Sequence, residues 1–399
     1  MPGKLKQMKS PLHELSKKMN AYISRFSNTN QQFELRDITE KFSLDALAIC
    51  VFGFKTDSFT KDTSKFLKDA NGFFHVVSEA DDDSQLSNPK KLIRYFKEKW
   101  INLPFYIPNS IKQFLQNIKM NMFCHFLAND HARYLMQVVE KRKASGKTDN
   151  DLIGMMMEAI ERPSKYEMEN DADQYERDVN IHRNKPKEKL SRDSVISTAL
   201  LMLSAGYDTT GTAMAFVLYE LASNPDCQEK LLKEIKQAQN DVSKMPYMDA
   251  VIHESMRKHP LLANLERVCT EDHRFEGHDY EVKEGEMIRV SNIGICLDPD
   301  IFPEPQKFCP ERFLKNDSNN MNRIPWSQYR NKNPFAFSLG QRNCLAMNFA
   351  MYEMKVGIST LIREFKLIRG DKTPEKIKWN PLSILGVAKG GLWIKCERR

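Results

Sequence analysis

The longest apolar stretch of the chain, residues 194–223, carries an acidic residue near its centre. The stretch is long enough to cross a bilayer as a helix. However, Asp208 would cost about 2.5–3.5 kcal/mol at that depth on membrane-insertion scales, and hydroxyl residues surround it. The stretch therefore predicts a helix buried inside the protein rather than a membrane span.

The middle of this stretch is rich in residues that form helices poorly. Each glycine there costs about 1 kcal/mol relative to alanine, and hydroxyl side chains can bond back to carbonyl groups and bend the axis. We therefore expect an interrupted helix, where an acid beside an alcohol can position water and relay protons. A merely kinked core helix without chemistry is the alternative. The residues concerned are Gly206, Asp208, Thr209, Thr210, Gly211 and Thr212.

A cysteine stands immediately before a second apolar segment, in "FAFSLGQRNCLAMNFAMYEMK" from Phe335 onward. The apolar residues that follow Cys344 recur with helical period, and Gly340 permits a backbone conformation closed to other residues. The pattern predicts a tight loop that presents the sulfur at a helix N-terminus. That helix end and the nearby Arg342 both favour the thiolate over the thiol.

Charged residues at helical spacing occur in "VIHESMRKHP", where Glu254 and Arg257 lie one turn apart. On an exposed helix such a pair contributes only about 0.2–0.5 kcal/mol. It is not a zinc-protease motif, because Arg257 stands where that motif needs its second histidine. The later segment "PERF" adds Arg312. A buried glutamate held by two guanidinium groups would be a strong fastener if it were fully hydrogen-bonded.

The remaining patterns favour a mainly α fold with minor β structure. Residues 11–56 and 119–142 are predicted to be helical, and the closing "GLWIKCERR" is predicted to be a strand after a glycine turn. Residues 92–114 suit either a helix–loop–helix or a membrane-dipping surface, since aromatic and basic side chains favour that interface. Residues 161–192 are mostly polar and are expected to form a surface loop.

Charge and cysteine content exclude some functional classes. The net charge of +7 is mild, and no nucleic-acid-binding or phosphate-loop motif is present, so we expect no nucleic-acid partner. Eight cysteines without a CxxC spacing fit reduced intracellular thiols better than a disulfide framework. The polar, basic N-terminal residues contain no apolar signal core.

The chain resembles the cytochrome P450 family along nearly its whole length. The resemblance rests on four motifs that occur in that family's order and spacing: AGYDTT, ExxR, PERF and FxxGxRxC. The region "LERVCTEDHRFEGHDYEVKEGEMI" also resembles the animal microsomal branch that handles hydrophobic xenobiotics and lipids. The resemblance implies a single P450 domain over residues 1–399. It also implies that the membrane anchor and the first helices and strands of the family fold are missing.

The resemblance assigns roles to individual residues. Cys344 would be the axial thiolate ligand of haem b, the implied cofactor. Asp208 and Thr209 would deliver protons during oxygen activation. Arg342 and Arg267 would pair with haem propionates, and Phe337, Gly340, Ala346 and Ala205 would complete the haem-binding set. Glu254, Arg257 and Arg312 would fasten the core on the haem side. Substrate contacts would come from Leu201, Ser204, Leu262, Ala263, Leu385 and Val387.

The implied reaction inserts one atom of O2 into a hydrophobic small molecule such as a xenobiotic, a steroid or a lipid. Electrons would come from NADPH–cytochrome P450 reductase, with cytochrome b5 as a further possible donor. An acidic partner suits a basic face, for which Lys230, Lys233, Lys236, Arg330 and Lys332 are candidates, although an ordinary solvated face explains them equally well. The resemblance places the protein on the cytosolic face of the endoplasmic reticulum membrane, with peripheral membrane contact.

Two departures from the family pattern leave alternatives open. Ala346 replaces the glycine usual two residues after the cysteine, and an added methyl group costs roughly 1–3 kcal/mol where the site cannot relax. The missing front of the fold makes a haem-binding but catalytically inactive relative the main alternative. A cysteine-nucleophile enzyme would need a histidine near Cys344, and none occurs in that loop. A P450-like isomerase or peroxide-using enzyme would not need the Asp208–Thr209 pair.

Overall fold

Helices dominate the described part of the chain, which confirms the expected mainly α fold with minor β structure. The computed structural model describes residues 8–53, 57–59, 140, 151, 153–154, 156–157, 192–239, 241–314, 334–340, 342–381, 383 and 385–399. The helices are α2 (Lys9–Thr29), α3 (Leu35–Cys50), α10 (Arg192–Ser223), α11 (Pro225–Gln237), α12 (Pro246–Lys258), α13 (Asn292–Cys296), α14 (Pro334–Phe337) and α15 (Met347–Glu364), with 3-10 turns η2 (Val242–Lys244) and η3 (Pro310–Phe313). The predictions for residues 92–114, 119–142 and 161–192 fall almost entirely outside the described residues.

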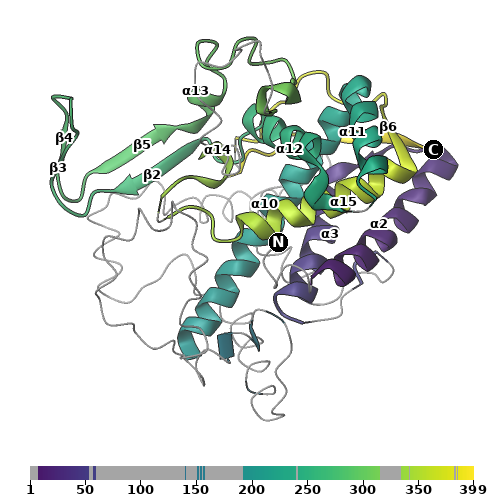
Figure 1. The fold of residues 1–399 in the computed structure, drawn as a ribbon, viewed down its shortest axis with the longest axis horizontal. Helices are drawn as coiled ribbons and strands as arrows, with labels where there is room; N and C mark the ends of the chain where they lie inside the picture. Colours follow the sequence, from purple (N-terminus) through teal and green to yellow (C-terminus); the bar gives the residue numbers. More distant parts are fainter. Residues whose placement is uncertain are drawn as a thin grey trace, which may run out of the picture.

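A three-stranded antiparallel sheet joins the two ends of the described chain. Its strands are β1 (Phe33–Glu34), β7 (Trp393–Arg398) and β6 (Phe365–Arg369), in that order across the sheet. The predicted C-terminal strand is confirmed as β7, which follows two glycines with positive φ, Gly390 and Gly391. The N-terminal helices and the C-terminal strands consequently lie on the same side of the molecule (Figure 1).

The region 11–56, predicted to be helical, contains two helices, α2 and α3, with β1 between them. Asn30 adopts a left-handed conformation (φ 52°) at the end of α2, and its amide bonds back to the last turn. After β1, the Glu34 carboxylate accepts a hydrogen bond from the Asp37 amide (2.7 Å) and caps the start of α3. These two local signals separate the helices and turn the chain so that α3 packs against α10.

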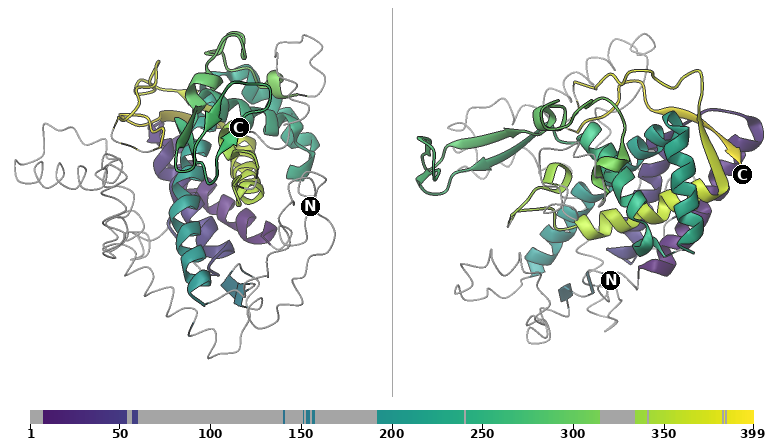
Figure 2. Two further views of the ribbon diagram at one scale, coloured as in Figure 1. Left: turned by 90° about the vertical axis from the view of Figure 1, so that its left-hand side faces the viewer. Right: turned by 45° about the horizontal axis from the view of Figure 1, so that its top comes forward.

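The expected interruption of α10 is wrong, because the helix is continuous from Arg192 to Ser223. The glycines serve close packing instead. A Cβ atom at Gly211 would lie 2.9 Å from the Glu40 Cα, and one at Gly206 would lie 2.9 Å from a Leu47 methyl group. Helix α3 therefore crosses α10 at a distance that larger residues would prevent (Figure 2). Tertiary packing outweighs the poor helix propensity of these residues.

The main hydrophobic core forms where α15 packs against α2, α10 and α11. Met354, Ile358 and Leu361 of α15 are fully buried there. The first turn of α12 is held to α11 by Glu234, whose carboxylate oxygens accept hydrogen bonds from the Tyr247 amide (2.7 Å) and the next amide (2.8 Å). This core fixes α15, and with it the loop that precedes α15, relative to α10.

Two antiparallel strand pairs extend from the helical part (Figures 1 and 2). Strand β2 (Asn264–Val268) pairs with β5 (Met287–Ser291), and β3 (His273–Arg274) pairs with β4 (Glu281–Val282). The first pair follows α12 and ends at α13. It therefore carries residues from the end of the ExxR helix toward the cysteine loop.

Candidate active site around Cys344

The loop before α15 is closed by backbone hydrogen bonds. The Cys344 amide donates to the Phe337 carbonyl (2.8 Å), and the Asn343 amide donates to the Gly340 carbonyl (3.1 Å). Gly340 has φ +81°, a conformation that L side chains rarely adopt. The predicted tight loop is thus present, and helix α15 begins three residues after the cysteine, at Met347. The Cys344 side chain is exposed, so its sulfur is accessible to a ligand.

The residues beside Cys344 divide into a buried anchor and an exposed face. Phe337 is buried in the main core and fixes the start of the loop. Leu345 is 80% exposed although it is apolar, and Arg342 is exposed. Ala346 is half-buried at the N-cap of α15. Farther along, Phe349 packs against the hydrophobic cluster that includes residues of α10, so the start of α15 lies close to the N-terminal half of that helix.

Strand β2 and the segment before it lie beside the cysteine loop. The Arg267 guanidinium donates to the Ser338 hydroxyl (3.1 Å). The buried amide of Asn292 donates both to the Leu262 carbonyl (2.9 Å) and to the Phe335 carbonyl (2.8 Å). The structure therefore brings two predicted site residues, Arg267 and Leu262, next to the loop that carries the sulfur.

The segment near the C-terminus lies against the same strand region. The Gly386 amide donates to the Leu261 carbonyl (2.7 Å), which places its neighbours Leu385 and Val387 near the residues that follow α12. Leu385 is half-buried, whereas Val387 is buried. Ala263 is exposed and its carbonyl accepts a hydrogen bond from the amide at the start of α13. Four of the predicted substrate residues thus belong to one neighbourhood.

Helix α10 presents predicted residues on two different sides. Leu201, Ala205 and Thr209 recur every four residues and share one face, where Leu201 is 60% exposed and Thr209 is half-buried. The Thr209 hydroxyl donates to the Ala205 carbonyl of the same helix (2.6 Å). The side chain of Ser204 lies outside the described part of the structure. Asp208, in contrast, is buried on the side that faces α3.

Asp208 is paired with a residue that the motifs do not contain. Its Oδ1 atom accepts a hydrogen bond from the Arg36 Nη2 atom (2.7 Å) and another from the Thr212 hydroxyl (3.3 Å). Arg36 also forms an ion pair with Glu40. Burial acts to lower the pKa of Arg36, but the carboxylates of Glu40 and Asp208 outweigh it and raise that pKa. The acid and the alcohol predicted to act together therefore point to different partners.

The ExxR and PERF segments meet in a buried ion-pair cluster. Arg257 donates to both carboxylate oxygens of Glu254 (2.7 and 2.9 Å), and both side chains are fully buried. Arg312 approaches the same carboxylate (3.4 Å). The remaining Arg257 donors reach the Cys296 carbonyl (2.7 Å) and the Pro305 carbonyl (2.9 Å). Burial raises the pKa of Glu254 although Arg257 opposes the shift. The cluster ties α12 to α13 and η3, which suits a structural role.

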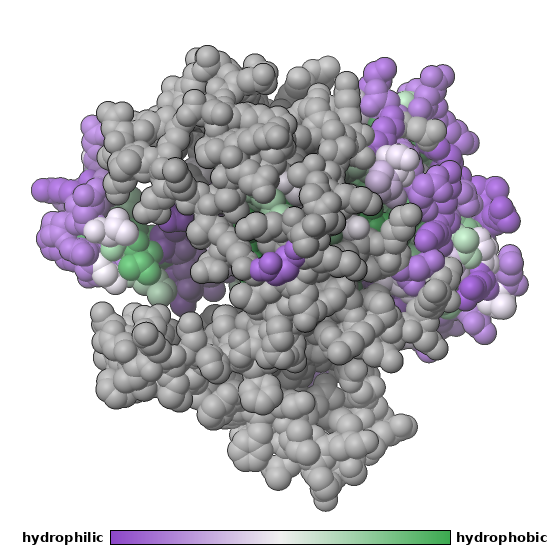
Figure 3. All heavy atoms as spheres, turned by 90° about the horizontal axis from the view of Figure 1, so that it is seen from below, coloured by the Kyte–Doolittle hydropathy of each residue, from purple (hydrophilic) through white to green (hydrophobic). Residues whose placement is uncertain are grey.

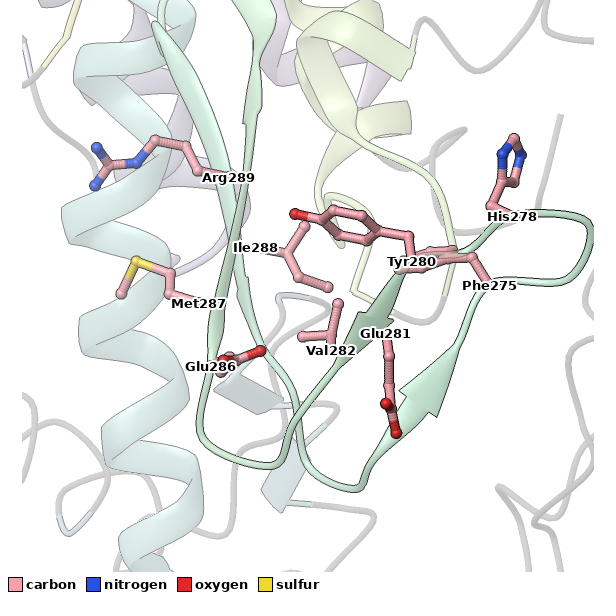
Figure 4. Close-up of a pocket in the computed structure, with 9 residues that line it drawn as sticks. All are labelled: Phe275, His278, Tyr280, Glu281, Val282, Glu286, Met287, Ile288 and Arg289. Carbon is pink, nitrogen blue, oxygen red and sulfur yellow. The ribbon is translucent and has the colours of Figure 1, made fainter.

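A surface pocket of about 860 Å³ lies on the strand extension and shares no residue with the predicted site. Figure 4 shows its lining residues, which come from β4, β5 and the adjoining turns. Exposed apolar side chains of the same extension include Val268, Met287 and Val290. In Figure 3, which views the molecule from below, the described surface at the left is mostly hydrophilic with a small hydrophobic area.

Among the described helices, none combines the length and hydrophobicity that a bilayer crossing requires.

Three residues that contribute to the site were missed by the sequence reasoning: Arg36, Glu40 and Asn292. Arg36 and Glu40 lie one helical turn apart on α3, among both polar and apolar residues. That spacing was the available signal, but the partner of Arg36 is 172 positions away and no local pattern indicates it. Asn292 gives no signal beyond being a polar residue after a strand.

Comparisons with known proteins identify the family of the chain. The profile of the Cytochrome P450 family matches residues 1–393. Cytochrome P450 6B1 of Papilio polyxenes is 29% identical over 411 residues, covering 100% of this chain and 73% of that protein. Probable cytochrome P450 6a19 of Drosophila melanogaster is 28% identical, covering 99% of this chain and 71% of that protein. Cytochrome P450 3A29 of Sus scrofa is 26% identical, covering 91% of this chain and 64% of that protein. The chain therefore belongs to the cytochrome P450 family.

Proposed function

We propose that this cytochrome P450 oxidises a hydrophobic small molecule of xenobiotic, steroid or lipid type, with electrons from an NADPH-dependent reductase. The observation that carries the proposal is the accessible Cys344 sulfur, held in a closed loop at the start of α15. As a family member, the chain is a monooxygenase that binds haem b through a cysteine thiolate. A catalytically inactive relative, the alternative drawn from the sequence, is not favoured by this match.

The residues around Cys344 fit a haem. The group needs a sulfur donor, cations for its two carboxylates and apolar side chains for its ring. Cys344 is accessible, Arg267 and Arg342 are exposed, and Leu345 is an exposed apolar neighbour. We propose that Cys344 ligates the iron and that the two arginines bind the propionates. When bound, the haem activates O2, and thiolate ligation favours cleavage of the O–O bond.

The chain's own residues perform three tasks around this group. The backbone bonds of the loop hold Cys344 in place and keep its orientation fixed. Thr209, half-buried on the exposed face of α10, offers a hydroxyl oxygen that can hold a water molecule. Asp208 supplies an ionisable carboxyl one residue away, although its present hydrogen bonds are with Arg36 and Thr212. We propose that Asp208 and Thr209 move protons to the reacting centre.

Substrate specificity would come from the apolar residues near α10 and β2. Leu201 and Leu262 are large exposed hydrophobic side chains, which suits contact with a hydrophobic substrate. Ala263 is exposed and Leu385 is half-buried in the segments that follow α12 and precede the C-terminal strand. Val387 is buried and suits a packing role better than direct contact. Ala205 lies between Leu201 and Thr209 on the same helix face, where its small side chain leaves room for the haem.

The redox partner and the location belong to the same proposal. Lys233 and Lys236 of α11 are exposed and suit an acidic reductase. Lys230 already forms an ion pair with Glu311 (2.7 Å), so it is less available to bind an acidic reductase. Arg330 and Lys332 lie outside the described residues. We propose peripheral contact with the endoplasmic reticulum membrane on its cytosolic face, supported by the exposed apolar side chains of the strand extension.

The test is the absorption spectrum of the reduced, CO-bound protein after expression with haem supply. A strongly red-shifted Soret band that is lost in Cys344→Ala and kept in Cys269→Ala supports the ligand assignment. Cys269 is the matched control because it is a half-buried free cysteine on the neighbouring strand region. An unshifted Soret band in the unmodified protein would refute the assignment of Cys344 as the iron ligand. Product formation from hydrophobic compounds with NADPH and purified reductase tests the finer proposal.

A further inference from the structure

Three ring side chains pack together beside the two segments that carry proposed substrate contacts, residues 261–263 and 385–387. Phe216 of α10 and His259, which ends α12, are stacked with their ring centroids 4.6 Å apart and their planes 14° apart. The Trp379 ring lies against both, with its centroid 5.7 Å from that of Phe216 and 6.0 Å from that of His259. This ring cluster was not part of the site predicted from the sequence.

Buried contacts fix two of the three rings on the helical core. Phe216 is almost fully buried in α10. The Nε2 atom of His259 lies 2.6 Å from the Oε1 atom of the buried Glu220, and the Lys258 ammonium group donates to the same oxygen (2.9 Å). The His259 ring therefore links the end of α12 to α10 and cannot tilt without breaking this hydrogen bond. Trp379 consequently rests on a firm surface that two helices provide.

Trp379 stands at the base of the C-terminal turn that carries Leu385 and Val387. It pairs with Ala388 in an antiparallel bridge, and the next amide, that of Asn380, donates to the Val387 carbonyl (2.8 Å). The indole and the turn are thus held together by backbone hydrogen bonds. A shift of the indole therefore shifts the turn.

Gly386, within this turn, marks the point where the indole and the segment after α12 meet. A Cβ atom at Gly386 would lie 3.3 Å from the Trp379 Cζ3 atom and 2.8 Å from the Pro260 carbonyl oxygen. The Gly386 amide donates to the Leu261 carbonyl (2.7 Å). Because protein interiors are close-packed, the bulk of the indole sets where the turn lies relative to the segment after α12.

We propose that Trp379 is a positioning residue for substrate specificity. Supported by Phe216 and His259, its indole sets the relative position of Leu262 and Leu385, and with it the size of the hydrophobic molecule that these two side chains accept. Trp379 acts through the turn and does not itself contact the substrate. It lies outside the main core and is 38% exposed, so a smaller side chain there changes the support of the turn more than the stability of the fold. The inference rests on the proposed substrate contacts of Leu262 and Leu385.

The experiment measures how tightly the haem-loaded protein binds two nitrogen ligands of the iron, imidazole and the larger 4-phenylimidazole, from the shift of the Soret band. Because both ligands bind the iron through an imidazole nitrogen, the ratio of their Kd values isolates the fit of the phenyl group. The variants are Trp379→Leu and Trp379→Phe, with Trp393→Leu as the matched control. Trp393 is a half-buried ring on β7 that contacts the Lys372 ammonium group (4.7 Å) and donates to the Gly390 carbonyl (2.9 Å).

Trp379→Leu is expected to raise the Kd of 4-phenylimidazole relative to that of imidazole about tenfold, near the lower end of the roughly 10–200-fold by which a methylene-sized misfit in an apolar pocket changes discrimination. Trp379→Phe is expected to recover most of this change, because phenylalanine keeps a ring against Phe216 and His259. Trp393→Leu is expected to leave the ratio of Kd values unchanged.

Thermal unfolding and one further variant make the failures distinguishable. A lower Tm in Trp379→Leu with an unchanged ratio of Kd values, while Leu385→Ala changes that ratio, overturns the inference and leaves Trp379 as a structural residue. An unchanged ratio in both variants overturns the proposed substrate contact of Leu385 and the inference with it. An equal change of the ratio in Trp393→Leu also overturns the inference, because Trp393 does not support the turn.

Discussion

Glu353 gives the sharpest quantitative prediction of the structure. This α15 residue is completely buried, and among the described residues neither carboxylate oxygen makes a hydrogen bond of normal geometry, although the Ser43 hydroxyl lies near. Burial raises the pKa of Glu353 from its ordinary value of 4.5 to about 8, and the Ser43 hydroxyl opposes the shift only in part. The folded protein therefore keeps a proton at neutral pH that the unfolded chain has released.

The sign and size of the effect follow from this proton. Because the folded state binds more protons between about pH 4.5 and pH 8, the free energy of unfolding falls as pH rises through that window. At about 1.4 kcal/mol per pH unit, the loss between pH 5 and pH 8 is about 3–4 kcal/mol. An unfolding entropy of about 2.1 cal/mol/K per residue over 399 residues converts this loss to about 4 °C in Tm.

The assay is thermal unfolding of the unmodified protein and of Glu353→Gln at several pH values from 5 to 8. Glutamine has nearly the same shape as glutamate but stays neutral at every pH. The Tm of Glu353→Gln minus the Tm of the unmodified protein is therefore expected to increase by about 4 °C from pH 5 to pH 8. Other titrating groups contribute equally to both proteins and cancel. A difference that stays constant with pH would refute the assignment of a protonated Glu353.

Glu220→Gln is the matched control. Glu220 is equally buried on the neighbouring helix α10, but it bonds to His259 (2.6 Å) and Lys258 (2.9 Å). Burial acts to raise the pKa of Glu220, yet these partners outweigh it and lower that pKa. Its contribution to stability is then fully present above pH 4.5 and disappears only as the pH falls below that value. The Tm difference for Glu220→Gln should be negative and flat from about pH 7 to 8, where His259, whose pKa is lowered by burial, stays neutral in both proteins.

Three further predictions concern packing and the buried network. Gly211→Ala should lower the free energy of unfolding by about 1–3 kcal/mol, because the added methyl group meets the backbone of α3. Gly206→Ala should cost less, because its methyl group meets only the end of the flexible Leu47 side chain. Equal losses of Tm in the two variants would contradict this reasoning. Arg257→Ala should cost about 3–5 kcal/mol, because the buried Glu254 charge loses its bidentate partner and keeps only the more distant Arg312. A loss below about 1 kcal/mol in chemical denaturation would argue against a charged pair. Asn292→Ala should cost about 1 kcal/mol for each of the two hydrogen bonds that its amide donates to backbone carbonyls, and it should weaken haem retention on gel filtration. Full retention would show that those bonds do not hold the cysteine loop.

Local features of the site could be predicted from the sequence alone. The glycine before Cys344 indicated a tight loop, and the apolar period after it indicated a helix; both depend on residues within a few positions of one another. The closing strand β7 was equally predictable, because glycines and alternating side chains define it locally. The spacing of Glu254 and Arg257 indicated a pair but not its burial, since a pair at that spacing is more often exposed.

Contacts between distant segments were decided only by the tertiary structure. The glycines and threonines of α10 predicted a broken helix, but α3 packs so closely against them that the helix stays continuous and the glycines make room for the crossing. The same crossing brings Arg36 to Asp208 across 172 positions of sequence. The sequence determines helix period, turns and the order of the motifs, because these arise between neighbours along the chain. Which side of a helix is covered, and by which charge, depends on how separate helices pack, and that is settled only when the whole core forms.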